Sequence, residues 1–254
     1  MAFLGGVYSN HLALRAAAED ARRRGASTIL CLGDLGGFGP HPGKVLPILD
    51  EFGIVTIGGN YDESLAARKK DCGCGYTHPR DNHYAQLSYE YTDRLTTDTE
   101  RERLRLPFSI AFTRRGRRLY VCHGSPRRTN EFLWESACSD GFLARLLREA
   151  NADTLICSHT GIHWQRRLPD GGIVINAGAV GRPANDGRTE VWYALLEEGS
   201  DEATFIPVAY DFESLAREME EESLPPEFVE TIRTGWWTTC LEILPAKERA
   251  RGRF

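Results

Sequence analysis

Four polar residues each come shortly after an apolar run that is typical of a buried strand. The pairs of run and residue are TILCL with Asp34, IVTI with Asn60, LYVC with His123, and TLIC with His159. Ligand sites in open α/β sheets lie outside the carboxyl ends of the strands, so these four side chains can converge on one point. A carboxylate, an amide oxygen and two imidazoles suit one divalent ion such as manganese, iron, cobalt or zinc. The sequence therefore predicts a site for a single metal ion.

Each of these residues also has an ordinary structural interpretation. Asp34 could cap a turn, Asn60 could occupy a left-handed turn, and the two histidines could be hydrogen-bonded core groups. Three of the four adjoin a glycine, namely Gly33, Gly59 and Gly124, and a residue without a side chain lets the backbone approach a ligand closely. This coincidence favours a metal site over four unrelated structural roles.

The elements that would position these residues follow from the hydrophobic pattern. The first half of the chain alternates apolar runs of strand length with amphipathic stretches, which is typical of βαβ units and a largely parallel sheet. Strands are predicted at 3–8, 28–32 and 54–57, and helices at 11–24 and 41–52. Ser9 or Asn10 should cap the first helix, while Gly25 and Gly53 should end the two helices.

The second half changes its pattern after residue 164. Before that point we expect strands at 109–113, 119–122 and 154–157, and a helix at 141–150. After it, tight turns join strands at 165–168, 173–176, 191–196 and 204–210, which should form a second sheet packed on the first. Helices are expected at 212–221 and 225–233. The polar segment 71–106 is interpreted as a cap-like insertion with helices at 84–95 and 98–106, and 246–254 as a flexible tail.

Composition places the chain among ordinary globular proteins. Its 254 residues are 41% hydrophobic and 26% charged, which fits one domain over 1–254. No apolar run approaches the roughly 20 residues of a membrane span, and the N-terminus lacks a basic targeting region, so we expect a cytoplasmic protein without a membrane partner. The formal net charge of -5 argues against binding to duplex nucleic acid.

The seven cysteines fall into different settings. Cys31, Cys122 and Cys157 lie inside apolar runs and are expected to be reduced and structural. Cys72 and Cys74, in the stretch DCGCGY, are one residue apart and adjoin glycines. A metal or redox role for this pair stays open, although zinc ligands usually have a wider spacing.

Five motifs together resemble the calcineurin-like metallophosphoesterases, especially their small bacterial and archaeal phosphodiesterase-like branch. The motifs are GD at 33–34, GNYD at 59–62, HGSP at 123–126, SHTG at 158–161 and NAGAVGRP at 176–183. The resemblance implies a four-layer α/β/β/α sandwich whose two-metal centre hydrolyses phosphomonoesters or phosphodiesters. By position, Asp34 resembles the carboxylate that bridges both ions. Asn60, His123 and His159 resemble the other ligands of the second ion.

The first ion of that centre lacks its ligands in this chain. The opening motif of the family carries an aspartate and a histidine where this chain has Gly6 and Tyr8, and the last metal histidine corresponds to Gly161. Glycine has no side-chain donor, and a neutral tyrosine with a pKa near 10 is a poor ligand. We therefore expect one ion. His163, two residues beyond Gly161, is the candidate for a compensating ligand.

The loss of one ion predicts weak catalysis. Two ions about 3.5–4 Å apart clamp both the attacking and the leaving oxygen, and a single ion cannot. Since each factor of ten in rate corresponds to about 1.4 kcal/mol, turnover should fall by orders of magnitude. The predicted catalytic residues are Asp34, Asn60, His123 and Tyr61. Tyr61 stands where many relatives have a histidine that helps to protonate the leaving group, and its phenol could donate to a phosphate oxygen.

Two arginines next to the motifs are predicted to bind phosphate. Arg127 follows HGSP and Arg182 follows NAGAVG, and a planar guanidinium suits phosphate oxygens. The alternative for Arg127 is a solvated basic turn.

Two functions follow from these residues. The first is a metal-dependent phosphoesterase of low activity that acts on a small phosphoester. The alternative is an impaired relative that binds a phosphorylated ligand or a protein partner without cleaving it. The sequence predicts neither the substrate, the metal nor the oligomeric state.

Overall fold

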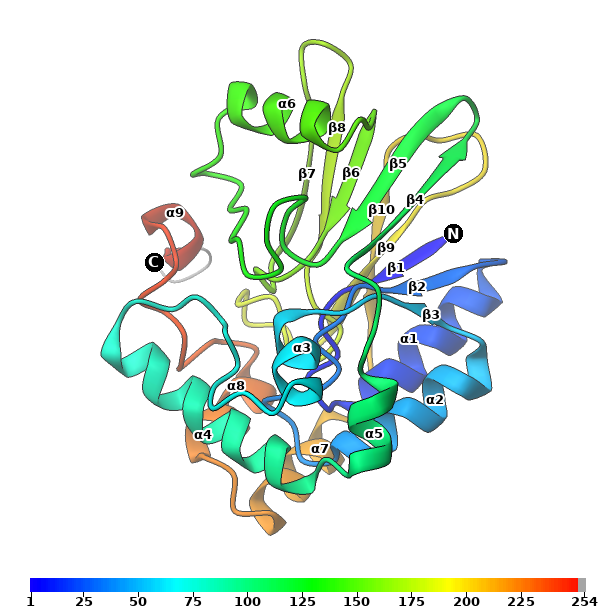
Figure 1. The fold of residues 1–254 in the computed structure, drawn as a ribbon. Coiled ribbons are helices and arrows are strands. Elements are labelled where there is room, and N and C mark those ends of the chain that lie inside the picture. Colours follow the sequence, from blue (N-terminus) through cyan, green and yellow to red (C-terminus); the bar gives the residue numbers. More distant parts are fainter. Residues whose placement is uncertain (251–254) are drawn as a thin grey trace.

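Two five-stranded sheets pack face to face in the computed structural model, which describes residues 1–250. Helices cover the outer face of each sheet, with α1 and α2 on one side and α6 on the other (Figure 1). The four-layer α/β/β/α sandwich predicted from the sequence is confirmed.

The first sheet has the strand order β10-β9-β1-β2-β3. Its strands are β1 (Ala2–Leu4), β2 (Ile29–Cys31), β3 (Val55–Thr56), β9 (Val191–Leu195) and β10 (Thr204–Val208). Strands β1, β2 and β3 run parallel, while β9 pairs antiparallel with both β1 and β10. Outside this sheet lie α1 (His11–Arg23), the short 3-10 turn Pro42–Lys44 and α2 (Val45–Phe52). Asn10 caps α1, because its side-chain oxygen accepts from the Ala13 N–H at 3.0 Å.

The second sheet has the order β4-β5-β6-β8-β7. Its strands are β4 (Ser109–Arg114), β5 (Arg117–Cys122), β6 (Thr154–Cys157), β7 (His163–Arg167) and β8 (Ile173–Ala177), and α6 (Asp140–Glu149) covers its outer face. Strands β5, β6 and β8 are parallel, and β4 and β7 form antiparallel edges.

The predicted division of the strands between the sheets was wrong. β9 and β10 return to the first sheet, where β9 pairs with β1, whereas β4, β5 and β6 belong to the second sheet. The pattern of apolar residues shows that a strand is buried, but it does not identify the neighbour with which the strand pairs. Pairing with β9 satisfies the backbone of the edge of β1 that β2 leaves open.

The core between the sheets is built by alternate residues of the central strands. Phe3 and Leu30 point toward the second sheet and meet Ile156 and Ile175, while Leu4 points outward toward α1. Side chains two residues apart in a strand share a face, so one strand contributes to both layers. Each such buried side chain contributes roughly 1.5–3 kcal/mol. This packing fixes the strand ends that carry the polar residues.

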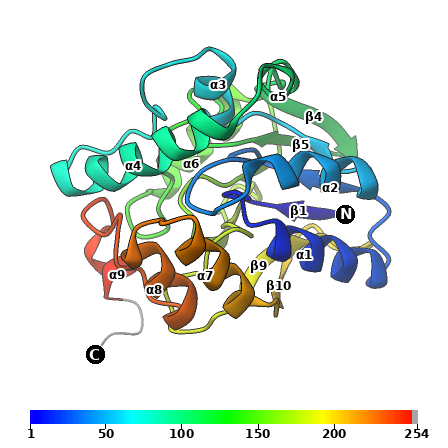
Figure 2. The ribbon, with the colours of Figure 1, turned by 90° about the horizontal axis from the view of Figure 1, so that it is seen from below.

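Further helices surround the carboxyl ends of the strands. They are α3 (Asn60–Ala66), α4 (Pro79–Leu95), α5 (Asp98–Arg103), α7 (Phe212–Glu221), α8 (Pro226–Thr234) and α9 (Ala246–Arg249). Helices α4 and α8 lie on the same side of the molecule (Figures 1 and 2), and Tyr84 of α4 donates to Glu227 of α8 at 2.6 Å. Helix α3 was not expected, because its seven residues are too few to show an amphipathic period.

The segment expected to be a flexible tail contains α9. Glu248 in this helix is buried and accepts a hydrogen bond from the Ser136 N–H at 2.8 Å. Residues 251–254 of that segment lie outside the described part of the chain. Within residues 1–250, the helices lack the length and apolar character that a membrane span requires.

Candidate metal centre

The polar residues predicted to converge come from both sheets. Asp34 and Asn60 lie just beyond β2 and β3 of the first sheet, and His123 and His159 just beyond β5 and β6 of the second. The ligand atoms of Asp34, His123 and His159 lie within 4.8 Å of one another, and all three side chains are buried. The site therefore sits where the carboxyl ends of the two packed sheets meet.

His123 is the centre of this group. Its Nε2 lies 3.1 Å from Asp34 Oδ2 and 3.2 Å from His159 Nδ1. Its Nδ1 lies 2.5 Å from the carbonyl oxygen of Leu32, which can only accept, so we assign the Nδ1 proton to that bond. The Nε2 lone pair then faces the Asp34 carboxylate. Electron pairs that face one another in a buried space suit a cation between them.

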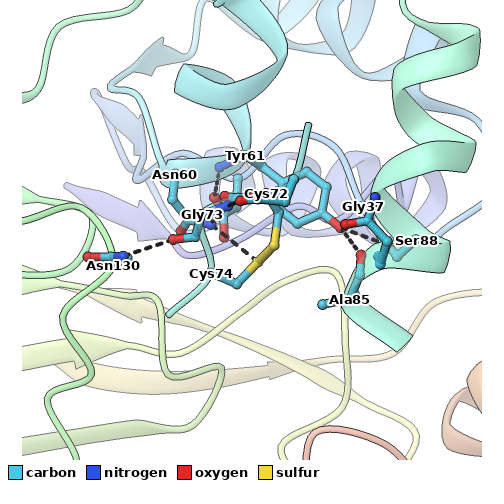
Figure 3. Close-up of a disulfide and its surroundings, with 12 residues drawn as sticks. Gly37, Asn60, Tyr61, Cys72, Gly73, Cys74, Ala85, Ser88 and Asn130 are labelled. Carbon is cyan, nitrogen blue, oxygen red and sulfur yellow. Dashed lines mark hydrogen bonds between the residues drawn. A yellow bond between two sulfur atoms is a disulfide. The ribbon is translucent and has the colours of Figure 1, made fainter. Parts of the chain in front are cut away.

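Asn60 occupies the first position of α3 and is oriented by its amide nitrogen. Nδ2 donates to the Cys72 carbonyl oxygen at 2.9 Å and to Cys74 Sγ at 3.4 Å, as the close-up in Figure 3 shows. Its Oδ1 is buried and accepts no hydrogen bond from residues 1–250. An unpaired buried acceptor costs about 1–3 kcal/mol, and a bound cation would remove that cost. The donor set therefore fits a divalent ion held by one amide oxygen, one carboxylate and two imidazoles.

The pKa values of Asp34 and His159 match what an ion requires, whereas an ion would have to displace a proton that Asp34 favours on His123. Burial acts to raise the pKa of Asp34, but neighbouring His123 outweighs it, and the pKa lies below its ordinary value. Burial acts to lower the pKa of His123, but the Asp34 carboxylate raises it more. Burial, followed by His123, lowers the pKa of His159 to about 3. Near pH 7, Asp34 is thus ionised and His159 is neutral, the states in which both can bind a metal.

Asp62 hydrogen-bonds to the loops that follow β2 and β3 of the first sheet. Its Oδ2 accepts the backbone N–H groups of Asp34 and Gly59, both at 2.8 Å, and its Oδ1 accepts that of Leu35 at 3.0 Å. Asp62 is the last residue of the GNYD motif, but it is not among the predicted site residues. The available signal was its place in the first turn of α3, where a carboxylate often accepts backbone N–H groups.

The backbone at the site is held in an uncommon conformation. Asp34 and His159 have φ values of 51° and 64°, in the left-handed region. Non-glycine residues there carry strain that tends to concentrate at functional sites. A side-chain carbon at Gly59 would lie 2.3 Å from Asp34 Oδ1, so the close approach of the two loops requires glycine.

Aromatic rings fill the positions where the first ion's ligands are missing. A side-chain carbon at Gly6 would lie 2.6 Å from the ring of Tyr8, and one at Gly161 would lie 3.0 Å from the ring of Trp237. These two positions are therefore closed by packing. Trp237, which follows α8, packs at the edge of the metal centre.

Arg182 is buried and lies beside Trp237. Its guanidinium carbon is 4.0 Å from the ring centroid of Trp237 and 4.9 Å from that of Phe38. Its Nη2 donates to the Thr239 carbonyl oxygen at 2.9 Å, and its Nε has no hydrogen-bond partner within residues 1–250. Arg182 lines the same cavity as Asp34 and His159, so it presents a positive charge to that cavity.

Tyr61 contributes to the site through two groups. Its backbone N–H donates to Asp34 Oδ1 at 3.1 Å, and its hydroxyl donates to Ser88 Oγ on α4 at 2.9 Å. The phenol ring lines the cavity next to the metal centre.

The remaining two candidates lie elsewhere. Arg127 pairs with Glu131 and lies 5.2 Å over the ring of Phe142, and it does not line the cavity. The ring of His163 packs at 4.5 Å from that of Trp192 and 4.7 Å from that of Phe205. It is outside the group of Asp34, His123 and His159, so a ligand role would require the ring to leave this packing.

Comparison with known proteins agrees with the fold and with the motifs. Residues 5–201 match the profile of the calcineurin-like phosphoesterase superfamily domain. An uncharacterized protein of Methanocaldococcus jannaschii is 23% identical over 252 residues, which cover 92% of this chain and 98% of that protein.

Two solved structures resemble the whole chain. A hypothetical protein of Pyrococcus horikoshii OT3 has a TM-score of 0.78 at 20% identity, over 94% of this chain and 99% of that one. A metallophosphoesterase of Sphaerobacter thermophilus has a TM-score of 0.72 at 23% identity, over 92% and 98%. At these identities the likeness concerns the fold.

Proposed function

Because this chain belongs to the calcineurin-like phosphoesterase superfamily, we propose that it hydrolyses phosphoesters with the help of one divalent metal ion. The residues that would hold the ion are Asp34, Asn60, His123 and His159. The observation that carries this proposal is the buried group of Asp34, His123 and His159, whose ligand atoms lie within 4.8 Å of one another. The unpaired Oδ1 of Asn60 adds a fourth donor.

The ion, when bound, would polarise a phosphoryl oxygen and lower the pKa of a bound water molecule. The protein positions the groups around it. The Leu32 carbonyl fixes the ring of His123 through Nδ1, at 2.5 Å, and the Tyr61 backbone N–H fixes one Asp34 oxygen. The free Nε of Arg182 points to a role in binding a phosphoryl oxygen, because a buried guanidinium favours an anion beside it. Arg127, which pairs with Glu131, is the weaker candidate for phosphate.

Low turnover is part of this proposal. The rings of Tyr8 and Trp237 occupy the space beside Gly6 and Gly161, where ligands of the first ion would stand. The protein would therefore lack one of the two ions that form the clamp. The fixed positive charge of Arg182 replaces some of that lost charge, but it cannot activate a water molecule as an ion can.

The surroundings of the site support a small substrate. Helix α4, from the segment 71–106 interpreted as a cap, contributes Tyr84, Ala85 and Ser88 to the cavity. The donor set suits manganese, iron, cobalt or zinc, and the proposal includes a cytoplasmic location.

The alternative function is binding of a phosphorylated ligand or a protein partner without hydrolysis. The rings of Tyr8 and Trp237 favour this alternative. They would exclude the first ion, while Arg182 and the predicted ligands of the other ion stay in place.

The test is metal analysis followed by hydrolysis of 4-nitrophenyl phosphate and bis(4-nitrophenyl) phosphate with added manganese. We expect one ion per chain, and turnover that disappears in Asp34→Ala. Asp98→Ala is the matched control, since Asp98 is an exposed carboxylate on α5. Equal rates for the protein and Asp34→Ala would contradict hydrolysis. Phosphate binding that persists without turnover would then support the alternative.

A further inference from the structure

A cavity of about 70 Å³ opens beside the metal centre, and nine of its 21 lining residues are Phe, Tyr or Trp. Asp34 and His159 form part of its lining. The aromatic lining residues are Tyr8, Phe38, Tyr61, Tyr76, Tyr84, Phe132, Trp134, Phe228 and Trp237. They come from distant parts of the chain, including α3, α4, α8 and the segment after α8. We propose that this cavity binds the organic group of an aromatic phosphoester, an inference that rests on the proposed hydrolysis.

The rings present flat faces next to the predicted ligands. Phe132 lies 4.2 Å from the ring of His159, and it stacks with an interplanar angle of 4° on Trp134 at 5.4 Å. Two further lining rings, those of Phe38 and Phe228, lie 4.7 Å apart. Flat walls of this kind suit a planar ring, which can stack on one face and contact edges on the other.

Two polar side chains of the lining, those of Ser88 and Thr160, already have partners. Ser88 Oγ accepts from the Phe38 N–H at 2.6 Å and from the Tyr61 hydroxyl at 2.9 Å. Thr160 Oγ1 donates to the Ile162 carbonyl oxygen at 3.2 Å. A sugar or another group rich in hydroxyls would therefore lose hydrogen bonds to water without replacing them. An aromatic ring has none to lose.

The two ends of the cavity define how such a ligand would lie. The phosphate would sit between the predicted ion and the guanidinium of Arg182, whose Nε is unpaired within residues 1–250. The organic group would then extend between the aromatic walls. A buried water molecule needs about 10–15 Å³ of cavity volume. A cavity of about 70 Å³ therefore has room for a single aromatic ring.

Binding of non-hydrolysable phosphonates tests the inference apart from turnover. Titration calorimetry on the manganese-loaded protein compares phenylphosphonate, cyclohexylphosphonate and methylphosphonate. We expect phenylphosphonate to bind at least tenfold more tightly than methylphosphonate, and severalfold more tightly than cyclohexylphosphonate. Phe132→Leu should reduce this preference, whereas Phe108→Leu, at an exposed ring outside the cavity, should keep it. The manganese affinity of Phe132→Leu verifies that His159 still binds the ion.

The possible results separate the two proposals. Equal affinities for the three phosphonates would overturn the aromatic inference and leave the hydrolase proposal standing. If none of them binds to manganese-loaded protein, both fail.

A second inference comes from the disulfide between Cys72 and Cys74. Both hydrogen bonds of the Asn60 amide nitrogen go to these two residues, at 2.9 Å and 3.4 Å (Figure 3). Since Nδ2 is held there, the orientation of the amide is fixed, and its buried Oδ1 has no hydrogen-bond partner within residues 1–250. We infer that this disulfide is a positioning element for Asn60, and that its reduction weakens binding of the proposed ion.

The rest of the loop supports this role. Gly73 between the two cysteines has a φ of 59°, and its carbonyl oxygen accepts from Asn130 Nδ2 at 2.9 Å. Cys74 lines the cavity, so a small reductant can reach its sulfur from there. The other cysteines in residues 1–250 are free thiols, and the three predicted to be structural are fully buried.

The redox step needs a dithiol as reductant. One thiolate of the dithiol attacks a sulfur of the pair, the bond between Cys72 and Cys74 breaks, and a mixed disulfide forms. The second thiol of the reductant then displaces the protein. Two electrons and two protons pass to Cys72 and Cys74, and the reductant leaves as a cyclic disulfide. The reduced loop no longer holds the Cys72 carbonyl oxygen and Cys74 Sγ where both accept from Asn60 Nδ2.

The test measures manganese affinity by competition with a chelating dye. The protein is compared before and after reduction with dithiothreitol, which is removed without air before the measurement. The number of thiols titrated under denaturing conditions should rise by two per chain on reduction. We expect manganese affinity to fall by about tenfold, as is usual when a group behind a metal ligand is lost. Asn60→Ala should bind more weakly from the start and show no further effect of reduction.

Cys138→Ser, at a free cysteine in another cluster, is the matched control and should keep the response. An unchanged affinity after a confirmed rise of two thiols would overturn the inference. So would an untreated protein in which all seven cysteines react. In either case the oxidised protein's ability to bind manganese still tests the hydrolase proposal separately.

Discussion

The ring of Trp237 lies against Gly161, at 3.0 Å from the point where a side-chain carbon would stand. Gly161 also has a φ of 74°, which residues with side chains rarely adopt. The resemblance to metallophosphoesterases places a metal-binding histidine at this position. The ligand has thus been replaced by a neighbouring ring, and the ring in turn supports the guanidinium of Arg182 at 4.0 Å.

This packing predicts the outcome of restoring the missing ligands. Gly6→Asp, Tyr8→His and Gly161→His together should not create a second metal site, because Trp237 still occupies the space. Adding Trp237→Ala should allow a second ion and raise phosphatase turnover at least tenfold. Metal content and hydrolysis of 4-nitrophenyl phosphate check both variants. Two ions in the triple variant with Trp237 intact would show that the ring gives way easily.

Asp62 should matter for stability as well as for the site. Asp62→Asn replaces an acceptor oxygen with an amide that cannot accept the facing N–H groups, so we expect a loss of roughly 2–4 kcal/mol in the free energy of unfolding. Burial, followed by Asp34, raises the pKa of Asp62 to about 7, so urea unfolding is best measured at pH 8. Asp98→Asn on the exposed surface serves as the control. Equal losses in both variants would argue against the role of the three backbone contacts.

The two histidines near Gly161 should differ sharply in metal binding. His159→Ala removes a predicted ligand and should weaken manganese binding by more than about 100-fold. Even the loss of a group that only hydrogen-bonds to a metal ligand lowers metal affinity by about 10–100-fold. His163→Ala should leave the affinity within about threefold, because its ring packs on Trp192 and Phe205. Calorimetric titration distinguishes them. A large loss in His163→Ala would mean that its ring turns to the site when the ion binds.

His11 should make stability depend on pH. Burial, followed by Lys44, lowers its pKa from 6.5 to about 4. The unfolded chain therefore takes up a proton near pH 6.5 while the folded protein does not, and stability falls as the pH drops from 6.5 toward 4. In His11→Gln this loss should be smaller by roughly 2 kcal/mol. Chemical unfolding between pH 4 and 7 measures it, with His83→Gln at an exposed ring as the control. Parallel curves for His11→Gln and the unaltered protein would contradict the assignment.

The sequence by itself determined the elements and most of the site. Apolar runs of strand length, each followed by a polar residue, predicted that Asp34, His123 and His159 converge, and their side chains do meet in the structure, because strand ends are where a sheet presents side chains to a ligand. The glycines that allow close approach were also visible, and Gly59 has that role. Local pattern suffices for such features because they depend on residues close together in the chain.

Only the tertiary structure decided how distant segments meet. β9 pairs with β1, as Phe3 does with Ala194, across most of the chain, which no periodicity encodes. Trp237 reaches Gly161, and the Cys72 carbonyl oxygen and Cys74 Sγ reach Asn60, through loops whose paths depend on packing. The resemblance implied that three ligands are missing at Gly6, Tyr8 and Gly161, but only the packed fold decided that the rings of Tyr8 and Trp237 lie against the two glycines.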